Sequence, residues 1–260
     1  MAGFVKKYWV LVVIIATFIV FKIPHLYYPY YWDESWPYAP AINMMFHHGA
    51  SLMPDALDPD LSRGHPLLFH SAAAIWMKIF GTSHLALHSF ALLISVLLLI
   101  AIYEAGLRLF NQRVAIFALL LLVMQVIFFV QSSFVLVEVL VAFLVFLSLC
   151  FYAGERYLLT TLCLTMLFYT KESGLIAGFV LGVDALISVF NKKLEMRARV
   201  YRLLSVGIPC ILVAVFFIIQ KHEGGDIFSR HAAHEMSLCI LAWIIEPAPA
   251  DVPPFPADPA

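Results

Sequence analysis

The sequence predicts an all-α integral membrane protein. Of its 260 residues, 63% are hydrophobic and only 13% are charged, and the mean hydropathy is +0.91. A water-soluble core cannot bury that much apolar surface. Apolar stretches also recur along the chain at close to the length of about 20 residues that crosses a bilayer. Because backbone groups in lipid must be hydrogen-bonded internally, we expect these stretches to be helices.

Seven apolar stretches predict about seven transmembrane helices. They cover residues 8–21, 85–103, 114–130, 134–152, 158–169, 175–190 and 203–219. The first stretch follows Lys6 and Lys7, as in a secretory signal peptide, but no small-residue cleavage site comes after it. We therefore expect it to remain as an uncleaved span.

The distribution of Lys and Arg predicts the orientation, because cytoplasmic loops carry the excess of these residues. A cytoplasmic N-terminus puts ten of the 16 inside: Lys6, Lys7, Arg108, Arg113, Arg156, Lys192, Lys193, Arg197, Arg199 and Arg202. Counting residues 67–80 as a further span would invert this arrangement from there on. We therefore expect a helix that lies at the outer interface or re-enters it, with His70, Trp76 and Lys78 reaching water or headgroups.

Residues 26–83 then form one long first extracytoplasmic loop with interfacial helices. A second helix in this loop is expected after Ser35 as N-cap, with Pro37 in its first turn and Gly49 at its end. Its apolar face comprises Tyr38, Ile42, Met45 and Phe46. We assign residues 1–235 to one membrane domain, and residues 236–260 to a short apolar stretch and a proline-rich tail that is expected to be disordered.

Two adjacent carboxylates follow the first span inside an aromatic cluster. Asp33 and Glu34 are preceded by Tyr30, Tyr31 and Trp32. Neighbouring side chains point in different directions, so only one of the pair is expected to face a given cavity. An interfacial aromatic belt with a solvated acidic pair explains the same pattern without any chemistry.

Cationic residues are expected on the same side of the membrane. Arg63 and His65 come later in the first loop, and Lys171 with Glu172 ends the fifth span. A carboxylate base near these cations is what sugar transfer from a lipid phosphate needs. The acceptor hydroxyl must lose a proton, and the departing phosphate needs its charge stabilised. A local ion pair between Lys171 and Glu172 is the structural alternative.

These residues resemble the membrane glycosyltransferases of the GT-C superfamily, of the protein O-mannosyltransferase and aminoarabinose transferase type in glycosyltransferase family 39. The resemblance rests on Asp33-Glu34, His65-Pro66 and Lys171-Glu172, and covers residues 6–190. It implies inverting transfer from a polyprenyl-phosphate sugar to a lipid, glycan or protein hydroxyl at the outer face of a bacterial plasma membrane. Asp33 is similar to the family's catalytic base, and the cations are similar to its phosphate clamp.

The resemblance extends to one further acid and to the length of the chain. Glu138, at the outer end of the fourth span, is similar to an acidic residue that recurs there in the family, although pairing within the bundle would also explain it. Family members usually have more spans, so we expect this chain to be the N-terminal part of such an enzyme. The rival hypothesis is a non-enzymatic membrane protein, either a transporter or an inactive fragment.

The sequence gives weaker evidence for a metal ion or nucleic acid as a ligand than for a lipid-linked sugar. Asp55, Asp58 and Asp60 have the spacing of a divalent-metal loop, and His84 with His88 has helical ligand spacing. Solvated loop acids and interfacial histidines explain both patterns, so no metal or other cofactor is assigned. Without a basic stripe carrying interleaved aromatics, nucleic acid is not expected as a partner, whereas membrane lipids are.

Overall fold

The computed structural model describes residues 2–191 and 193–222, and within these ranges the protein is helical, without a β-strand. Four helical segments are long and apolar enough to cross a membrane: Lys7–Tyr27, His84–Leu109, Glu172–Phe190 and Met196–His222. Apolar side chains cover their outer surfaces, as Phe179 and Phe190 do, which are 72% and 84% exposed. The prediction of an all-α chain is confirmed within the described residues, and these four helices are consistent with a membrane protein.

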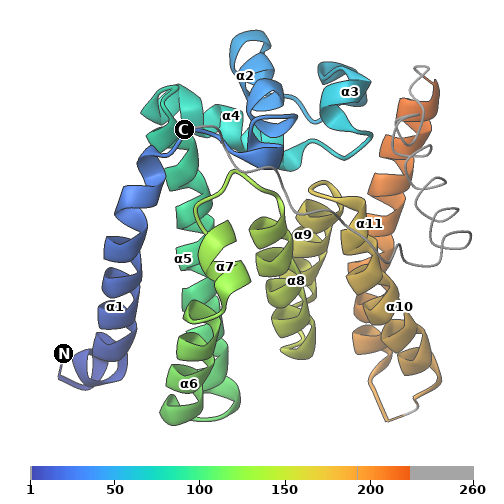
Figure 1. The fold of residues 1–260 in the computed structure, drawn as a ribbon. Helices are drawn as coiled ribbons and strands as arrows, with labels where there is room; N and C mark the ends of the chain where they lie inside the picture. Colours follow the sequence, from blue (N-terminus) through green and yellow to red (C-terminus); the bar gives the residue numbers. More distant parts are fainter. Residues whose placement is uncertain (1, 192, 223–260) are drawn as a thin grey trace, which may run out of the picture.

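The long helices and several shorter ones stand side by side as a bundle (Figure 1). They are α1 (Ala2–Lys22), α5 (His84–Leu109), α6 (Gln112–Val123), α7 (Val126–Gln131), α8 (Glu138–Ala153), α9 (Tyr157–Phe168), α10 (Leu175–Phe190) and α11 (Met196–His222). Helix α5 packs against α6 and α8, and α9 packs against α8 and α11. Gly106 permits the close α5–α6 contact, since a Cβ there would lie 2.7 Å from the Ala115 Cα atom.

Two of the predicted apolar stretches are not continuous helices. The stretch 114–130 is divided, because Gln125 is extended and separates α6 from α7. The polar Gln125 interrupts the apolar run, and Lys22 holds α7 against the end of α1 by donating a hydrogen bond of 2.5 Å to the Phe129 carbonyl. The next stretch becomes helical only at Glu138. As a result α6 and α8 contain only 12 and 16 residues, and α9 is also short, with 12.

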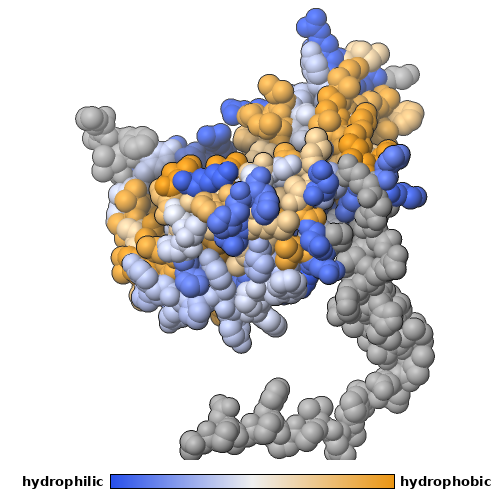
Figure 2. Space-filling model, turned by 90° about the horizontal axis from the view of Figure 1, so that it is seen from above, coloured by the Kyte–Doolittle hydropathy of each residue, from blue (hydrophilic) through white to orange (hydrophobic). Residues whose placement is uncertain are grey.

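The segment between α1 and α5 covers one end of the bundle (Figure 1). It contains the short helices η1 (Ile23–Tyr27), η2 (Trp32–Glu34), α2 (Tyr38–His48), η3 (Pro54–Ala56), α3 (Pro59–Ser62) and α4 (Leu68–Phe80). We call the end of the bundle that this segment covers the capped end. Figure 2 looks onto it and shows hydrophilic residues gathered across the surface, with hydrophobic residues beside them.

Helix α2 has the predicted buried face and the predicted end. Ile42 and Met45 are fully buried, and Gly49 ends the helix with a φ of 110°, which glycine adopts easily. The predicted start was wrong, since Pro37 and not Ser35 is the N-cap. The Ser35 hydroxyl instead donates to the Trp32 carbonyl at 2.6 Å and so closes the turn of η2.

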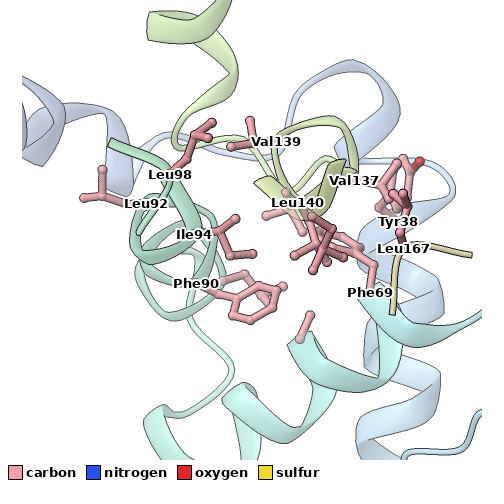
Figure 3. Packing of buried hydrophobic residues seen from close by; sticks show 14 of the residues in the cluster. Tyr38, Phe69, Phe90, Leu92, Ile94, Leu98, Val137, Val139, Leu140 and Leu167 are labelled. Carbon is pink, nitrogen blue, oxygen red and sulfur yellow. The ribbon is translucent and has the colours of Figure 1, made fainter. Parts of the chain in front are cut away.

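The core joins the capping helices to the bundle (Figure 3). Tyr38 of α2 and Phe69 of α4 lie in one apolar cluster with Phe90 of α5, Val137 before α8 and Leu167 of α9. Burial of aromatic side chains of this size contributes strongly to packing. The core therefore fixes the capping helices relative to α5, α8 and α9.

The opposite end of the bundle holds the turns between α5 and α6, α8 and α9, and α10 and α11 (Figure 1). Several arginines assigned to the cytoplasmic side fall there: Arg108, Arg113, Arg156, Arg197 and Arg202. We call this the arginine end. The predicted tail 236–260 and the boundary at residue 235 lie outside the described residues.

Candidate functional site at the capped end

Glu34 anchors the capping segment to the bundle. Its side chain is 1% exposed, and its Oε1 atom accepts a hydrogen bond from the Val135 backbone amide at 2.6 Å and lies 3.1 Å from His88 Nε2. Its Oε2 atom accepts a hydrogen bond from the Tyr31 amide at 3.2 Å. Buried carboxylates persist only when they are paired in this way. Glu34 therefore ties η2 to α5 and to the segment before α8.

His88 completes this anchor through both of its ring nitrogens. Its Nδ1 atom lies 3.0 Å from the Leu26 carbonyl oxygen, which can only accept, so Nδ1 carries a proton. Its Nε2 atom lies 3.1 Å from Glu34 Oε1, so the two buried side chains pair with each other. Tyr30 packs its ring at 4.4 Å from His84 and 5.6 Å from His88. Burial, and then the charge of Glu34, raises the pKa of Tyr30 to about 12.

Asp33 points away from this anchor. Its side chain is exposed, and no described residue donates a hydrogen bond to it. The backbone just before it is left-handed, since Trp32 has a φ of 56°. Non-glycine residues adopt this conformation at some energetic cost, and such residues cluster at functional sites. The adjacent carboxylates are thus separated into a buried, bonded one and an exposed, unbonded one.

Two ion pairs bring distant parts of the chain together beside the capping helices. His65 Nδ1 lies 2.7 Å from Glu172 Oε2, and Lys171 Nζ lies 3.1 Å from Glu138 Oε1. The alternative of a local Lys171–Glu172 pair is therefore wrong, because each residue pairs across the fold with a different element. The Leu68 amide also donates to the Tyr169 carbonyl at 2.8 Å, which holds the start of α4 against the end of α9.

Arg63 is the cation that stays available. Its side chain is exposed, and no described carboxylate or carbonyl forms a hydrogen bond with it. Its φ is 50° and that of Gly64 is 76°, so two successive residues are left-handed at this turn. The His65 amide, which follows, donates to the Ser62 carbonyl at 2.9 Å. The turn thus presents the guanidinium to solvent while His65 is held against Glu172.

Tyr38 stands among all these charges. The carboxylates of Glu138, Asp33 and Glu172 and the guanidinium of Arg63 all act electrostatically on its phenol. Burial, followed by the charges of Glu138 and Asp33, raises the pKa of Tyr38, and Arg63 opposes the shift. Tyr38 therefore stays a neutral phenol whose hydroxyl has no partner among the described residues. It can donate a hydrogen bond to an anionic ligand.

His70 stacks against Tyr38, and the prediction that it reaches water or headgroups was wrong. The two rings stack with centroids 5.4 Å apart, and His70 is only 3% exposed, so it does not reach water or headgroups. Its helix turns this position toward the core, whereas Lys78 is exposed as expected. Neither ring nitrogen has a hydrogen-bond partner among the described residues. Burial, and then the charge of His65, lowers the pKa of His70 to about 4, so the ring is neutral.

An apolar groove opens beside the charged cluster. It has a volume of about 390 Å³ and lies between η3, the start of α4, α9 and α11. Its lining includes Pro54, Leu68, Tyr169, Leu212 and Phe216. Leu68 and Tyr169 are close in sequence to His65 and Lys171, respectively, so the groove and the cations are neighbours. A ligand with an apolar chain and an anionic head matches this combination.

The two candidate metal sites, the aspartates of residues 55–60 and the pair His84 and His88, do not form a set of metal ligands in the described residues. Asp58 Oδ1 accepts from the Asp60 amide at 2.9 Å, which is a local turn. Both ring nitrogens of His88 are bonded to Leu26 and Glu34. In residues 2–191 and 193–222, no three His, Cys, Asp or Glu side chains form a group that could hold a metal ion.

The structure thus brings most of the predicted site residues to one place. Asp33, Arg63, His65, Lys171 and Glu138 lie around one surface, and Glu34 lies beneath it. Tyr38 and His70 were not predicted as site residues, because the sequence assigned Tyr38 to the apolar face of a helix and His70 to an interfacial helix where it would reach water or headgroups. No protein-family model, curated protein or solved structure matches this chain.

Proposed function

We propose that this chain is a GT-C-type glycosyltransferase that uses a polyprenyl-phosphate sugar. In this proposal α6 with α7, α8 and α9 supplement the four long helices to give about seven spans. The N-terminus and the arginine end face the cytoplasm of a bacterium, in accordance with the excess of cations there. The capped end then lies at the outer face of the plasma membrane.

One observation carries the proposal. An exposed carboxylate, Asp33, and an exposed guanidinium, Arg63, lie around the same phenol, Tyr38, next to an apolar groove. The carboxylate can take a proton, the guanidinium can bind phosphate oxygens in pairs, and the groove can receive part of a polyprenyl chain. A phospholipid would also fit groove and cation, but it does not account for an unbonded carboxylate beside them.

The reaction follows from these roles. The acceptor hydroxyl attacks the anomeric carbon as Asp33 removes its proton. The bond between that carbon and the phosphate oxygen breaks, and its electrons leave with the polyprenyl phosphate. Attack opposite to the leaving group inverts the configuration. Arg63, with Lys171 and His65 behind it, stabilises the departing phosphate.

Glu138 and Glu172 compete with the donor phosphate for Lys171 and His65. In the structure these carboxylates occupy Lys171 and His65 through the two ion pairs. A phosphate must therefore share Lys171 with Glu138, whereas Arg63 has no competitor among the described residues. Arg63 is then the first contact for the donor, and Lys171 the second.

The test is donor consumption by the purified chain in liposomes. Polyprenyl-phosphate-linked hexoses and pentoses are offered with a mixture of glycan, lipid and peptide acceptors, and the release of polyprenyl phosphate is measured. A nucleotide-linked sugar serves as the matched control donor. We expect turnover of a lipid-linked donor only. Binding without turnover would favour an inactive fragment, and neither binding nor turnover would favour the non-enzymatic alternative.

A further inference from the structure

A second groove lies at the arginine end, away from the proposed site. It has a volume of about 460 Å³ and runs between α5 and α8. Ala101 and Ala105 of α5 and Phe146 and Leu147 of α8 are among the apolar residues of its walls. Ala101 and Ala105 are small, which leaves room between the two helices.

Two arginines stand in this groove, and they are unequally paired. Arg108 on α5 forms an ion pair of 3.3 Å with Glu104, although its side chain is 66% exposed. Arg156, in the turn after α8, is exposed and has no ion-pair or hydrogen-bond partner for its guanidinium among the described residues. With Glu104 as the only acid of the lining, the groove carries a net positive charge at this end.

Arg202, also at the arginine end, differs from Arg156 in that carboxylates pair with its guanidinium. Its guanidinium lies 3.4 Å from both Glu155 and Asp184, and its side chain is only 18% exposed. Arg156 directly follows Glu155 in the sequence, yet that carboxylate pairs with Arg202 instead. The structure therefore leaves the cation in the groove free and neutralises the one outside it.

We propose that the groove binds a phospholipid with an anionic headgroup. Apolar walls accommodate an acyl chain, and a guanidinium binds phosphate oxygens in a bidentate manner. Basic pockets between membrane helices on the cytoplasmic side suit anionic lipids. The net charge selects an anionic headgroup over a zwitterionic one. This site is independent of the proposed sugar transfer.

Cys150 provides a probe inside the groove. It lines the wall next to Arg108, and Cys210 on α11 is an exposed thiol outside it. Cys163 and Cys239 are replaced by serine, and the chain is placed in nanodiscs of phosphatidylcholine alone or with added phosphatidylglycerol. The rates at which a membrane-permeant maleimide labels Cys150 and Cys210 are then compared. Native mass spectrometry of the same samples counts the retained phosphatidylglycerol.

We expect phosphatidylglycerol to slow the labelling of Cys150 and not that of Cys210. Each arginine near an anionic lipid contributes a factor of about five in affinity. Arg156→Ala and Arg108→Ala should each reduce the protection and the retained lipid by that factor, and Arg156→Lys should restore most of it. Arg113→Ala, an exposed arginine at the same end but outside the groove, is the matched control and should behave as wild type.

Several outcomes would overturn the proposal. Equal protection in both lipid mixtures would mean that the groove does not distinguish headgroups. Protection and lipid retention that persist in Arg108→Ala and Arg156→Ala would remove the arginines from the site. Protection that depends on protein concentration and not on lipid would identify a second copy of the chain as the occupant.

Discussion

Asp33 and Glu34 are neighbours in the sequence but belong to two different regions of the molecule. Glu34 enters the interior, where it accepts hydrogen bonds from the Tyr31 and Val135 amides and pairs with His88. Asp33 faces the surface and accepts none from the described residues. A charge that is buried and fully bonded serves the fold, whereas an exposed, unbonded carboxylate next to cations is available to a ligand.

The same division applies to the cations of the capped end. Lys22 is buried and binds the Phe129 carbonyl, and its ammonium also lies 4.4 Å from the centroid of the Phe129 ring. Arg63 is exposed without such contacts. Substitutions in the first region should therefore change stability, and those in the second should change binding and rate.

Removing Glu34 should have the largest effect on stability. Glu34→Ala leaves the buried ring of His88 without its partner and the Val135 amide without its acceptor. Breaking a buried pair in this way costs about 3–5 kcal/mol of unfolding free energy. Glu34→Gln should cost less, because the amide oxygen can still accept from Val135.

Reversible denaturation in detergent measures both values, and Asp33→Asn is the matched control. As an exposed substitution it should change the free energy of unfolding by less than about 0.5 kcal/mol. If Glu34→Ala and Asp33→Asn were equally stable, the anchor would not exist as described.

The neutral state of His70 predicts a pH dependence of stability. Its pKa in the folded protein is about 4, whereas an unfolded histidine titrates near 6.5. Between these values the unfolded chain binds more protons, so stability is complete above pH 6.5 and falls as the pH drops toward 4. The loss from this residue amounts to at most about 3 kcal/mol.

His70→Phe keeps a ring against Tyr38 and should remove this part of the pH dependence. The exposed His47 on α2 is the matched control, and His47→Phe should keep the wild-type slope. Unfolding measured from pH 7 to pH 4 compares the three proteins. Identical slopes for wild type and His70→Phe would show that His70 is solvated and titrates normally.

The exposed cations should affect the donor and leave the fold intact. A charged hydrogen bond to phosphate contributes about 1.5–3 kcal/mol, or roughly ten- to a hundredfold in affinity. Arg63→Ala should weaken binding of a short-chain polyprenyl phosphate by this amount, and Lys171→Ala by less, since Glu138 shares its charge. Arg63→Lys should recover only part of the loss, because a point charge lacks the paired geometry.

Calorimetric titration in detergent gives these affinities, with Lys78→Ala as the matched control. Lys78 is an exposed lysine on α4 that makes no contact with the charged cluster. Unchanged binding in both Arg63→Ala and Lys171→Ala would place the phosphate elsewhere.

Much of the fold could be predicted from the length of the apolar stretches and from the residues that end helices, such as Gly49. The long helices and the buried face of α2 were predicted, since hydrophobic periodicity depends only on local sequence. The break at Gln125 was not predicted, because a single polar residue in an apolar run does not by itself end a helix. The contact that holds α7 against α1 was not predictable either, since Lys22 and Phe129 are 107 residues apart. Ser35 is not the cap because it ends η2, where its hydroxyl donates to the Trp32 carbonyl, and α2 begins after Pro37.

The sequence predicted which residues form the candidate site, but it did not predict which of them pair with each other. The sequence indicated that Asp33, Arg63 and Lys171 would share a side of the membrane. It could not show that Lys171 pairs with Glu138 and His65 with Glu172, since these contacts are set by how α4, α8 and α9 pack. Tyr38 was assigned only to an apolar face, and its place among the charges appears in three dimensions alone.

The role of Asp33 is tested most directly by Asp33→Asn with a turnover assay and a denaturation curve on the same sample. The amide keeps the shape of the side chain but cannot accept the proton of the acceptor hydroxyl. We expect transfer from the polyprenyl-phosphate sugar to fall by about 10²- to 10⁴-fold, while unfolding and donor binding stay near wild type. Wild-type turnover by Asp33→Asn would contradict the assignment of Asp33 as the base.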